Sequence, residues 1–158
     1  MKLVVMGNSG SGKSTLARRA GLPHLDLDTL AWDPGPKRRP REQSRREIEG
    51  FLALHGEWVI EGCYADLLAL ALPQATKLVF LNPGIDACIA NARARPWEPH
   101  KYPSKEAQDA NLPMLERWIR DYETRSDEFS LQAHRALFDG FEGEKVEIRQ
   151  NQPGSIAP

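Results

Sequence analysis

The stretch Gly7-Asn8-Ser9-Gly10-Ser11-Gly12-Lys13-Ser14 decides the fold class, because it satisfies the pattern G-x-x-x-x-G-K-[ST]. The short apolar run Leu3-Val4-Val5-Met6 precedes it and is typical of a strand buried on both faces. Residues 14–20 follow as a predicted helix, which Gly21 and Pro23 end. A buried strand, a glycine-rich turn and a helix form the context in which this pattern binds phosphate.

Each residue type in this loop has a chemical reason. The glycines let the backbone curl so that successive N–H groups point at phosphate oxygens, and the helix N-terminus adds its partial positive charge. Lys13 is then expected to reach the β- and γ-phosphates as a catalytic cation, and Ser14 to place its hydroxyl on Mg²⁺. The alternative is a glycine-rich turn without a ligand. The predicted nucleotide-binding residues are Gly7, Asn8, Ser9, Gly10, Ser11, Gly12, Lys13, Ser14 and Thr15.

The rest of the chain alternates strands with helices. We predict further strands at 24–28, 58–62, 77–81 and 144–149, and helices at 42–54, 85–94 and 112–138, the last with a break near Ser126. Between them lie a loop at 33–41, an irregular segment with three prolines at 95–111, and a tail without pattern at 150–158. Such alternation predicts an α/β fold with a parallel sheet, whose functional loops lie at the carboxyl ends of the strands.

Length and composition restrict the class of protein. The chain has 158 residues, which suits one domain spanning 1–158, with 41% hydrophobic and 27% charged residues. The net charge of −1 gives no support for extensive nucleic-acid binding. Met1 to Gly7 is too short for a signal peptide, and residues 67–72 are too few to cross a membrane. We therefore expect a cytoplasmic protein without a membrane partner.

Three stretches resemble one family. Residues 6–18, residues 22–32 and Trp58-Val59-Ile60-Glu61-Gly62-Cys63-Tyr64 are similar to the adenylate-kinase-like proteins named DNA topology modulation proteins, and more distantly to shikimate, gluconate and adenylate kinases. The resemblance implies a three-layer αβα P-loop NTPase fold with a five-stranded parallel sheet in the order 2-3-1-4-5. It also implies a short lid at about 95–111 and an acceptor region at about 29–55.

Three acidic residues are candidates for the reaction. Asp26 and Asp28 end the second predicted strand, where two residues of spacing would put both carboxylates on one face. Similarity to the shikimate-kinase Asp-x-Asp pair implies that Asp26 helps hold Mg²⁺ and that Asp28 binds the acceptor hydroxyl and takes its proton. Glu61 stands where such kinases usually carry Asp, which implies a role toward Mg²⁺, and Gly62 would allow close approach of a ligand. Capping, turn or strand-end roles are the alternatives for these residues.

Basic and aromatic residues complete the predicted site. Arg38 lies in a basic loop that would attract an anionic acceptor, although a solvated loop or a nucleic-acid contact are alternatives. By resemblance, Arg93 and Arg95 are lid arginines that neutralise the transferring phosphoryl group; the alternative is a pair of cations favoured by the helix dipole. Trp32, which follows the Asp pair, is the best of three tryptophans (with Trp97 and Trp118) for lining an acceptor pocket.

Two functions follow from these residues. The leading one is a kinase-like phosphotransferase that moves the γ-phosphate of ATP, with Mg²⁺, to a small hydroxyl- or phosphate-bearing acceptor. The alternative is a nucleotide-gated regulatory or interaction ATPase linked to DNA topology, which the family resemblance suggests. Nucleotide and a small-molecule acceptor are thus the expected partners.

Overall fold

The fold is a parallel sheet with helices on both faces. The computed structural model describes residues 1–32 and 37–151. Residues 33–36 of the predicted loop and 152–158 of the predicted tail lie outside this range, as do parts of the predicted acceptor region and of the predicted domain. The strands are β1 Lys2–Gly7, β2 His24–Asp26, β3 Trp58–Gly62, β4 Lys77–Leu81 and β5 Glu144–Ile148.

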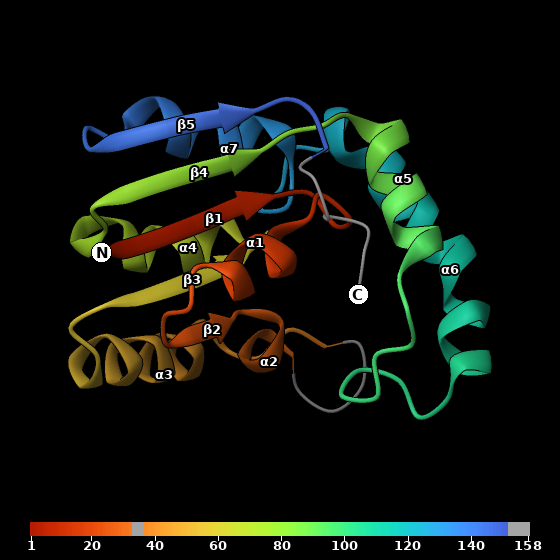
Figure 1. Cartoon of the computed structure of the whole chain (residues 1–158), viewed down its shortest axis with the longest axis horizontal. Coiled ribbons are helices and arrows are strands. Elements are labelled where there is room, and N and C mark those ends of the chain that lie inside the picture. Colours follow the sequence, from red (N-terminus) through yellow and green to blue (C-terminus); the bar gives the residue numbers. More distant parts are fainter. Residues whose placement is uncertain (33–36, 152–158) are drawn as a thin grey trace.

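The sheet has the order β2-β3-β1-β4-β5, and every neighbouring pair is parallel. This confirms the fold class and the strand order that the family resemblance implied. Because parallel strands end at one edge, the register pairs Asp26 with Glu61, and Met6 with Gly62. The residues that follow these strand ends therefore meet on one side of the sheet, to the right in Figure 1.

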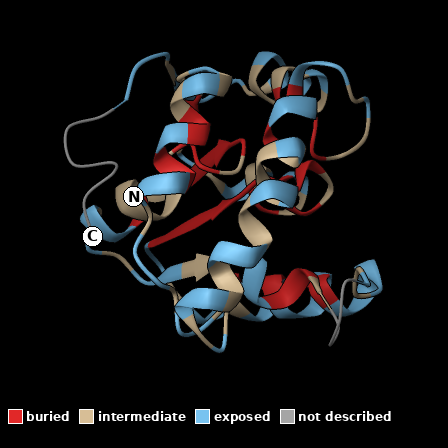
Figure 2. Cartoon of the chain, turned by 90° about the vertical axis from the view of Figure 1, so that its right-hand side faces the viewer, coloured by how far each residue is buried: buried red, intermediate tan, exposed pale blue. Residues whose placement is uncertain are grey.

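Successive side chains of the central strand point to opposite faces of the sheet, and each face packs in its own apolar core. Val4 and Met6 of β1 belong to the larger apolar cluster, which α3 (Arg41–Leu54), α4 (Ala65–Ala71) and α7 (Leu131–Gly140) cover. Leu3 and Val5 point to the opposite face, where Ala17 of α1 (Lys13–Arg19) packs. Figure 2 shows the buried residues gathered around the central strands, with exposed residues on the outer faces of the helices.

Two helices stand beyond the carboxyl ends of the strands. Helix α5 (Ile85–Ala94) follows β4, and α6 (Lys105–Arg120) packs against it; residues 95–104 connect the two and reach back below the sheet edge (Figure 1). The prediction of an irregular segment as far as residue 111 was wrong. The hydroxyl of Ser104 accepts a hydrogen bond from the backbone N–H of Ala107 at 3.1 Å. This cap starts α6 at Lys105, seven residues before the predicted helix.

The helix predicted at 112–138 is interrupted around Ser126, as predicted, but the interruption is longer than a simple break. Helix α6 ends at Arg120, the short 3₁₀ helix η2 (Asp121–Glu123) follows, and α7 begins only at Leu131. Ser130 caps α7 by accepting a hydrogen bond from the backbone N–H of Ala133 at 3.0 Å. Helix α4 and the 3₁₀ helix η1 (Leu72–Gln74) were not predicted.

The second strand is shorter than predicted, which moves Asp28. The backbone N–H of Leu27 still donates to the Glu61 carbonyl at 3.0 Å, but the next N–H, that of Asp28, donates to Asp26 Oδ1 at 2.9 Å. The chain therefore turns, and Asp28 begins the short helix α2 (Asp28–Ala31). Asp26 and Asp28 consequently do not share one face of a strand.

Among residues 1–32 and 37–151, no helix combines the length and the apolar character that a membrane crossing requires.

Candidate active site

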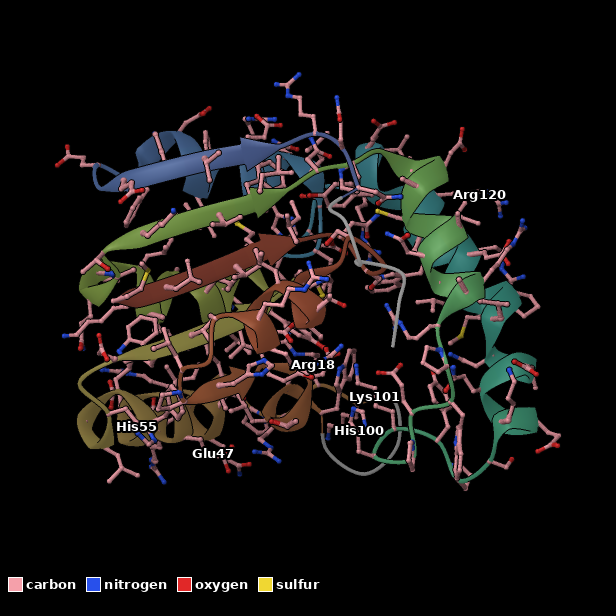
Figure 3. All side chains as sticks on the ribbon, viewed as in Figure 1. Arg18, Glu47, His55, His100, Lys101 and Arg120 are labelled. Atoms are coloured by element: carbon pink, nitrogen blue, oxygen red, sulfur yellow. The ribbon has the colours of Figure 1, made fainter. Side chains whose placement is uncertain are left out.

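Helices α5 and α6 and the segment 95–104 that connects them are called the α5–α6 arm. A cleft of about 810 Å³ lies between the carboxyl ends of the strands and this arm. The phosphate loop lines one part of it, and the segment 95–102 lines the opposite side. Figure 3 shows Arg18 of α1 and Lys101 of this segment approaching the same space, whereas Arg120 lies on the outer side of α6. The cleft thus brings the predicted phosphate site and the predicted lid together.

The phosphate loop can take its shape only with glycine at two positions. Gly10 has a φ of +78°, and a Cβ atom there would lie 2.3 Å from the Cys88 carbonyl oxygen of α5. A Cβ atom on Gly7 would lie 2.5 Å from the Leu81 carbonyl oxygen. Both distances are below any real carbon contact, so these glycines let the loop pass between β4 and α5.

Side chains from both outer helices hold this loop. Asn91 of α5 donates from Nδ2 to the Gly10 carbonyl at 2.8 Å. Asn8 donates from Nδ2 to the Ile119 carbonyl of α6 at 3.2 Å and accepts the Ser9 N–H at 2.8 Å through Oδ1. The loop is therefore fixed by contacts 81 and 111 residues away in sequence.

The donors inside the loop suit a phosphate chain. Gly12 precedes α1 in the left-handed conformation, and no side chain caps that helix end. The buried Ser11 Oγ has no hydrogen-bond partner among the described residues, and Lys13 donates from Nζ to the Asn8 carbonyl at 2.7 Å. Buried donors without partners are unfavourable unless a ligand satisfies them, so the loop fits an anionic ligand.

Beside the loop, Ser14 and Glu61 are arranged as a cation site would require. Ser14 donates from Oγ to Glu61 Oε2 at 2.6 Å, and His24 Nε2 lies 3.1 Å from the same oxygen. Glu61 is only 2% exposed. Asp26 lies opposite Glu61 in the β2–β3 register, and its pKa is raised to about 6, mainly by burial and then by the charges of Glu61 and Asp28. Carboxylates held this close to one another suit a nearby cation.

The described part of the chain contains no group of three or more His, Cys, Asp or Glu that could hold a metal unaided. Beside a phosphate chain, Mg²⁺ is usually held by one or two protein groups together with phosphate oxygens and water. The oxygens of Ser14, Glu61 and Asp26 suit that partial role.

Asp28 is the centre of a second network in the cleft. Tyr64 donates its hydroxyl hydrogen to Asp28 Oδ1, and Trp32 Nε1 donates to the Tyr64 hydroxyl at 2.8 Å. Lys101 donates from Nζ to Asp28 Oδ2 at 2.9 Å. Burial opposes the charge of this carboxylate, but Lys101 and the Tyr64 hydrogen bond outweigh it, so the pKa of Asp28 lies below its usual value. Its side chain remains 41% exposed, so the carboxylate is open to the cleft.

Arg38 does not line this cleft, in contrast to its predicted contact with substrate. It forms ion pairs with Glu128 at 2.8 Å and Asp66 at 3.2 Å, and donates from Nε to the Ala31 carbonyl at 3.2 Å. Its guanidinium carbon also lies 5.1 Å from the centre of the Tyr64 ring. Arg38 thus supports the wall of the cleft from outside and has its charge satisfied by protein groups.

Two further predicted site residues lie away from the cleft lining. A Cβ atom on Gly62 would lie 2.9 Å from the Leu27 side chain, so this glycine admits Leu27 and not a ligand. Arg93 makes two hydrogen bonds to the Glu116 carboxylate, at 2.7 and 3.0 Å, and its side chain is 59% exposed. Arg95, by contrast, lines the cleft and lies 3.3 Å from Glu98.

The sequence prediction omitted three residues that the structure brings to the site: Tyr64, Asn91 and Lys101. A signal existed for Tyr64, because it directly follows the third strand at the functional edge of the sheet. Asn91 and Lys101 had no such signal, since their partners lie 81 and 73 residues away.

No model of a known protein family matches this sequence, and no curated protein matches it. Solved structures with a similar course of the chain exist. A shikimate kinase from Bacteroides thetaiotaomicron is 18% identical with a TM-score of 0.46, covering 99% of this chain and 91% of that one. A shikimate kinase from Acinetobacter baumannii in complex with shikimate is 17% identical with a TM-score of 0.42, covering 86% of this chain and 90% of that one. An uncharacterized protein from Eubacterium ventriosum is 14% identical with a TM-score of 0.45, covering 93% and 88%.

At these identities and TM-scores, the likeness says nothing about what this chain binds. The strand order and the phosphate loop described above are those of a three-layer α/β fold of the P-loop type.

Proposed function

We propose that this chain is a phosphotransferase that moves the γ-phosphate of ATP to the hydroxyl of a small acceptor. The observation that carries the proposal is that Lys13 and Ser14 of the phosphate loop line the same cleft as the exposed carboxylate of Asp28. A phosphate-binding loop alone would suit any nucleotide-binding protein. A carboxylate across the same cleft adds the group that a hydroxyl acceptor requires.

In the proposed reaction, the acceptor hydroxyl attacks the γ-phosphorus of ATP. A new oxygen–phosphorus bond forms, the bond between the γ-phosphorus and the β,γ-bridging oxygen breaks, and ADP leaves. Asp28 binds the hydroxyl and accepts its proton. Its lowered pKa keeps it ionised at neutral pH, in the state that can accept a proton.

Charge neutralisation is the other requirement of phosphoryl transfer. Lys13 supplies a cation from the phosphate loop, and Arg95 supplies one from the segment that faces it. Mg²⁺, when bound, would add positive charge beside the phosphates, with Ser14, Glu61 and Asp26 as the residues that hold it. Arg93 is not part of this proposal, because Glu116 holds it outside the cleft.

The test is a comparison of variants with labelled ATP and a panel of hydroxyl compounds. Lys13→Ala is expected to abolish ATP binding, and Asp28→Asn to leave ATP binding intact while reducing transfer by a factor of about 10² or more. Lys105→Ala is the matched control, because Lys105 pairs with Asp109 on the surface of α6. Unchanged ATP affinity in Lys13→Ala would refute the site. Failure of every acceptor with ATP binding intact would count against phosphotransfer.

A nucleotide-gated regulatory ATPase is the second candidate, and one observation favours it. The phosphate loop is hydrogen-bonded to both α5 and α6, so its occupancy can be reported to the outer surface of the molecule. This function predicts ATP hydrolysis that no small acceptor stimulates, together with a partner retained only when ATP is present. A link to DNA topology would require that partner to be DNA or a DNA-binding protein.

A further inference from the structure

Aromatic side chains form the wall of the cleft beside Asp28. Trp32, Tyr64, Trp118 and Phe129 all line the cleft and contact one another. The rings of Trp32 and Phe129 are nearly parallel, with 4° between their planes and 6.5 Å between their centres. The Tyr64 ring stands edge-on to both, so the three pack together beside the carboxylate. Tyr64 and Phe129 are only 2% and 7% exposed, and Trp32 is the least buried of the three.

Two further large apolar side chains of the cleft lining are exposed. Trp97 and Met114 line the cleft although they are 42% and 56% exposed. Large apolar side chains exposed within a concave site indicate a ligand that covers them. The lining of the cleft therefore suits an apolar or aromatic surface on that ligand.

The charges in this part of the cleft are already paired. Of the lysines and arginines that line the cleft among the described residues, Lys13 and Arg18 belong to the phosphate loop and α1. The other two are Lys101, which lies 2.9 Å from Asp28 and 3.7 Å from Glu98, and Arg95, which lies 3.3 Å from Glu98. An anionic acceptor would have to compete with these carboxylates for both cations.

Two arginines near the cleft stack on its aromatic rings and are not available to bind an anionic ligand. Arg38 lies outside the lining, within 5.6 Å of the Phe129 ring centre, and is neutralised by Asp66 and Glu128. The guanidinium carbon of Arg125 lies 3.7 Å from the Trp118 ring centre, and Asp127 pairs with it at 2.6 Å. Cations stacked on rings in this way fix the rings and leave no free charge for a ligand.

We infer that the acceptor is an uncharged alcohol carrying a flat aromatic ring, of the kind that a nucleoside represents, and not a carboxylate or a phosphomonoester. The ring would pack against the rings of Trp32 and Trp97, which line the cleft and are not buried, and a hydroxyl of the attached group would reach Asp28. This inference rests on the proposed function for the transfer step. The selectivity of binding stands on these accessible aromatic rings and the paired charges alone.

The experiment measures acceptor binding without ATP and phosphate transfer with ATP, on the same preparation. The probes are adenosine, guanosine, cytidine and thymidine, their 5′-monophosphates, and shikimate and gluconate as carboxylate-bearing alcohols. Calorimetry gives each dissociation constant, and labelled ATP gives transfer. At least one nucleoside is expected to bind about tenfold tighter than its own monophosphate and than both carboxylates. Its affinity should change less than about twofold with added salt, since no ion pair is formed.

A pair of variants tests this packing. Trp97→Leu removes an exposed ring from the cleft lining, whereas Phe138→Leu removes a ring that packs against Phe80 in the core. Nucleoside affinity is expected to fall about tenfold in Trp97→Leu, because stacking on a ring is lost. It is expected to stay within about twofold in Phe138→Leu. If Trp97→Leu does not fold, the selectivity of the wild-type chain still decides the question.

Each outcome has one meaning. Tighter binding of a monophosphate or of a carboxylate, or no binding of any nucleoside, overturns the inference. Transfer of phosphate to shikimate or gluconate alone overturns it while supporting the proposed phosphotransferase. Selective nucleoside binding without any transfer supports the inference about the pocket and counts against the phosphotransferase.

Discussion

Lys101 and Asp28 form an ion pair across the cleft, with Lys101 Nζ 2.9 Å from Asp28 Oδ2, although 73 residues separate them in the chain. This pair joins the segment between α5 and α6 to the carboxyl edge of the sheet. By contrast, Trp97 Nε1 donates to the Tyr102 carbonyl and the Glu98 N–H donates to Gln108 Oε1, and both hydrogen bonds stay within the α5–α6 arm. Lys101 is therefore a tether between the arm and the sheet.

Replacing Lys101 with methionine should loosen the arm. The pair is partly exposed, at 24% and 41% for the two side chains, so its contribution is about 0.5 to 1 kcal/mol after allowance for solvent screening. Backbone hydrogens of residues 97–103 should then exchange about threefold faster, measured by hydrogen–deuterium exchange and mass spectrometry. Lys105→Met is the control, since Lys105 pairs with Asp109 inside α6. Equal exchange in both variants would mean that Lys101 does not hold the arm.

Gly10→Ala should damage the phosphate loop. At a φ of +78° a side chain is strained, and its Cβ atom would lie 2.3 Å from the backbone oxygen of Cys88, which cannot move without shifting α5. We expect a loss of at least about 2 kcal/mol in the free energy of unfolding, together with loss of ATP binding.

The control for this change is Gly50→Ala. Gly50 lies within α3, and a Cβ atom there meets nothing within 4 Å. Alanine should therefore raise the free energy of unfolding by about 0.5 to 1 kcal/mol, because it favours the helix. Urea unfolding of both variants checks the contrast, and similar effects at the two positions would contradict the packing argument.

Local sequence was sufficient for the parts of the fold whose contacts are local. The unit formed by β1, the phosphate loop and α1 is contiguous, and the pattern of glycines, lysine and serine that identifies it lies within eight residues. The strand order came from family resemblance, because register between strands depends on residues far apart. The start of α6 was misplaced even though Ser104 carries the ordinary signal of a helix start, since three nearby prolines favoured an irregular chain.

In the candidate site too, residues whose role depends on distant contacts could not be assigned from local sequence. Arg38 was expected to bind substrate, because a cluster of basic residues in a loop says nothing about which carboxylates lie nearby. Its partners come from two other segments, at Asp66 and Glu128, which are 28 and 90 residues away. Gly62 was expected to admit a ligand, and only the folded chain shows that Leu27 occupies that space.

The two lid arginines should differ in their effect on transfer. Arg95→Ala removes a cation from the cleft, and we expect the rate of phosphate transfer to fall by a factor on the order of 10² to 10³. Arg93→Ala removes an exposed partner of Glu116, and we expect a change of less than about threefold. Steady-state kinetics of the two variants decides the matter. A larger loss in Arg93→Ala than in Arg95→Ala would reverse the assignment.

His134 should make stability depend on pH. This side chain is fully buried; Nε2 donates to the Cys63 carbonyl at 2.7 Å, so Nδ1 accepts from the Tyr122 hydroxyl at 2.6 Å. Burial chiefly lowers its pKa to about 4, against about 6.5 in an unfolded chain. Between these values the unfolded chain binds a proton that the folded chain does not. The free energy of unfolding therefore decreases as the pH falls through this window, by about 3 kcal/mol in all.

Urea unfolding at several pH values between about 4 and 7 tests this dependence. His134→Gln should be less stable than the wild type at pH 7, and should also lose less stability on acidification. His100→Gln is the control, because His100 is 59% exposed and should leave the pH dependence unchanged. The same pH slope in His134→Gln as in the wild type would exclude this histidine as the cause.

The hydrogen bonds from Asn91 and Asn8 give the phosphate loop an additional property. Helix α5 both contacts Gly10 and continues into the segment that contains Lys101, so one helix joins the phosphate loop to the tether between arm and sheet. Thermodynamic linkage then requires reciprocity: if a bound phosphate chain favours one position of α5, holding α5 in that position must raise the affinity for the phosphate chain by the same factor. A binder raised against the outer face of α5 would thus act on nucleotide affinity without entering the cleft.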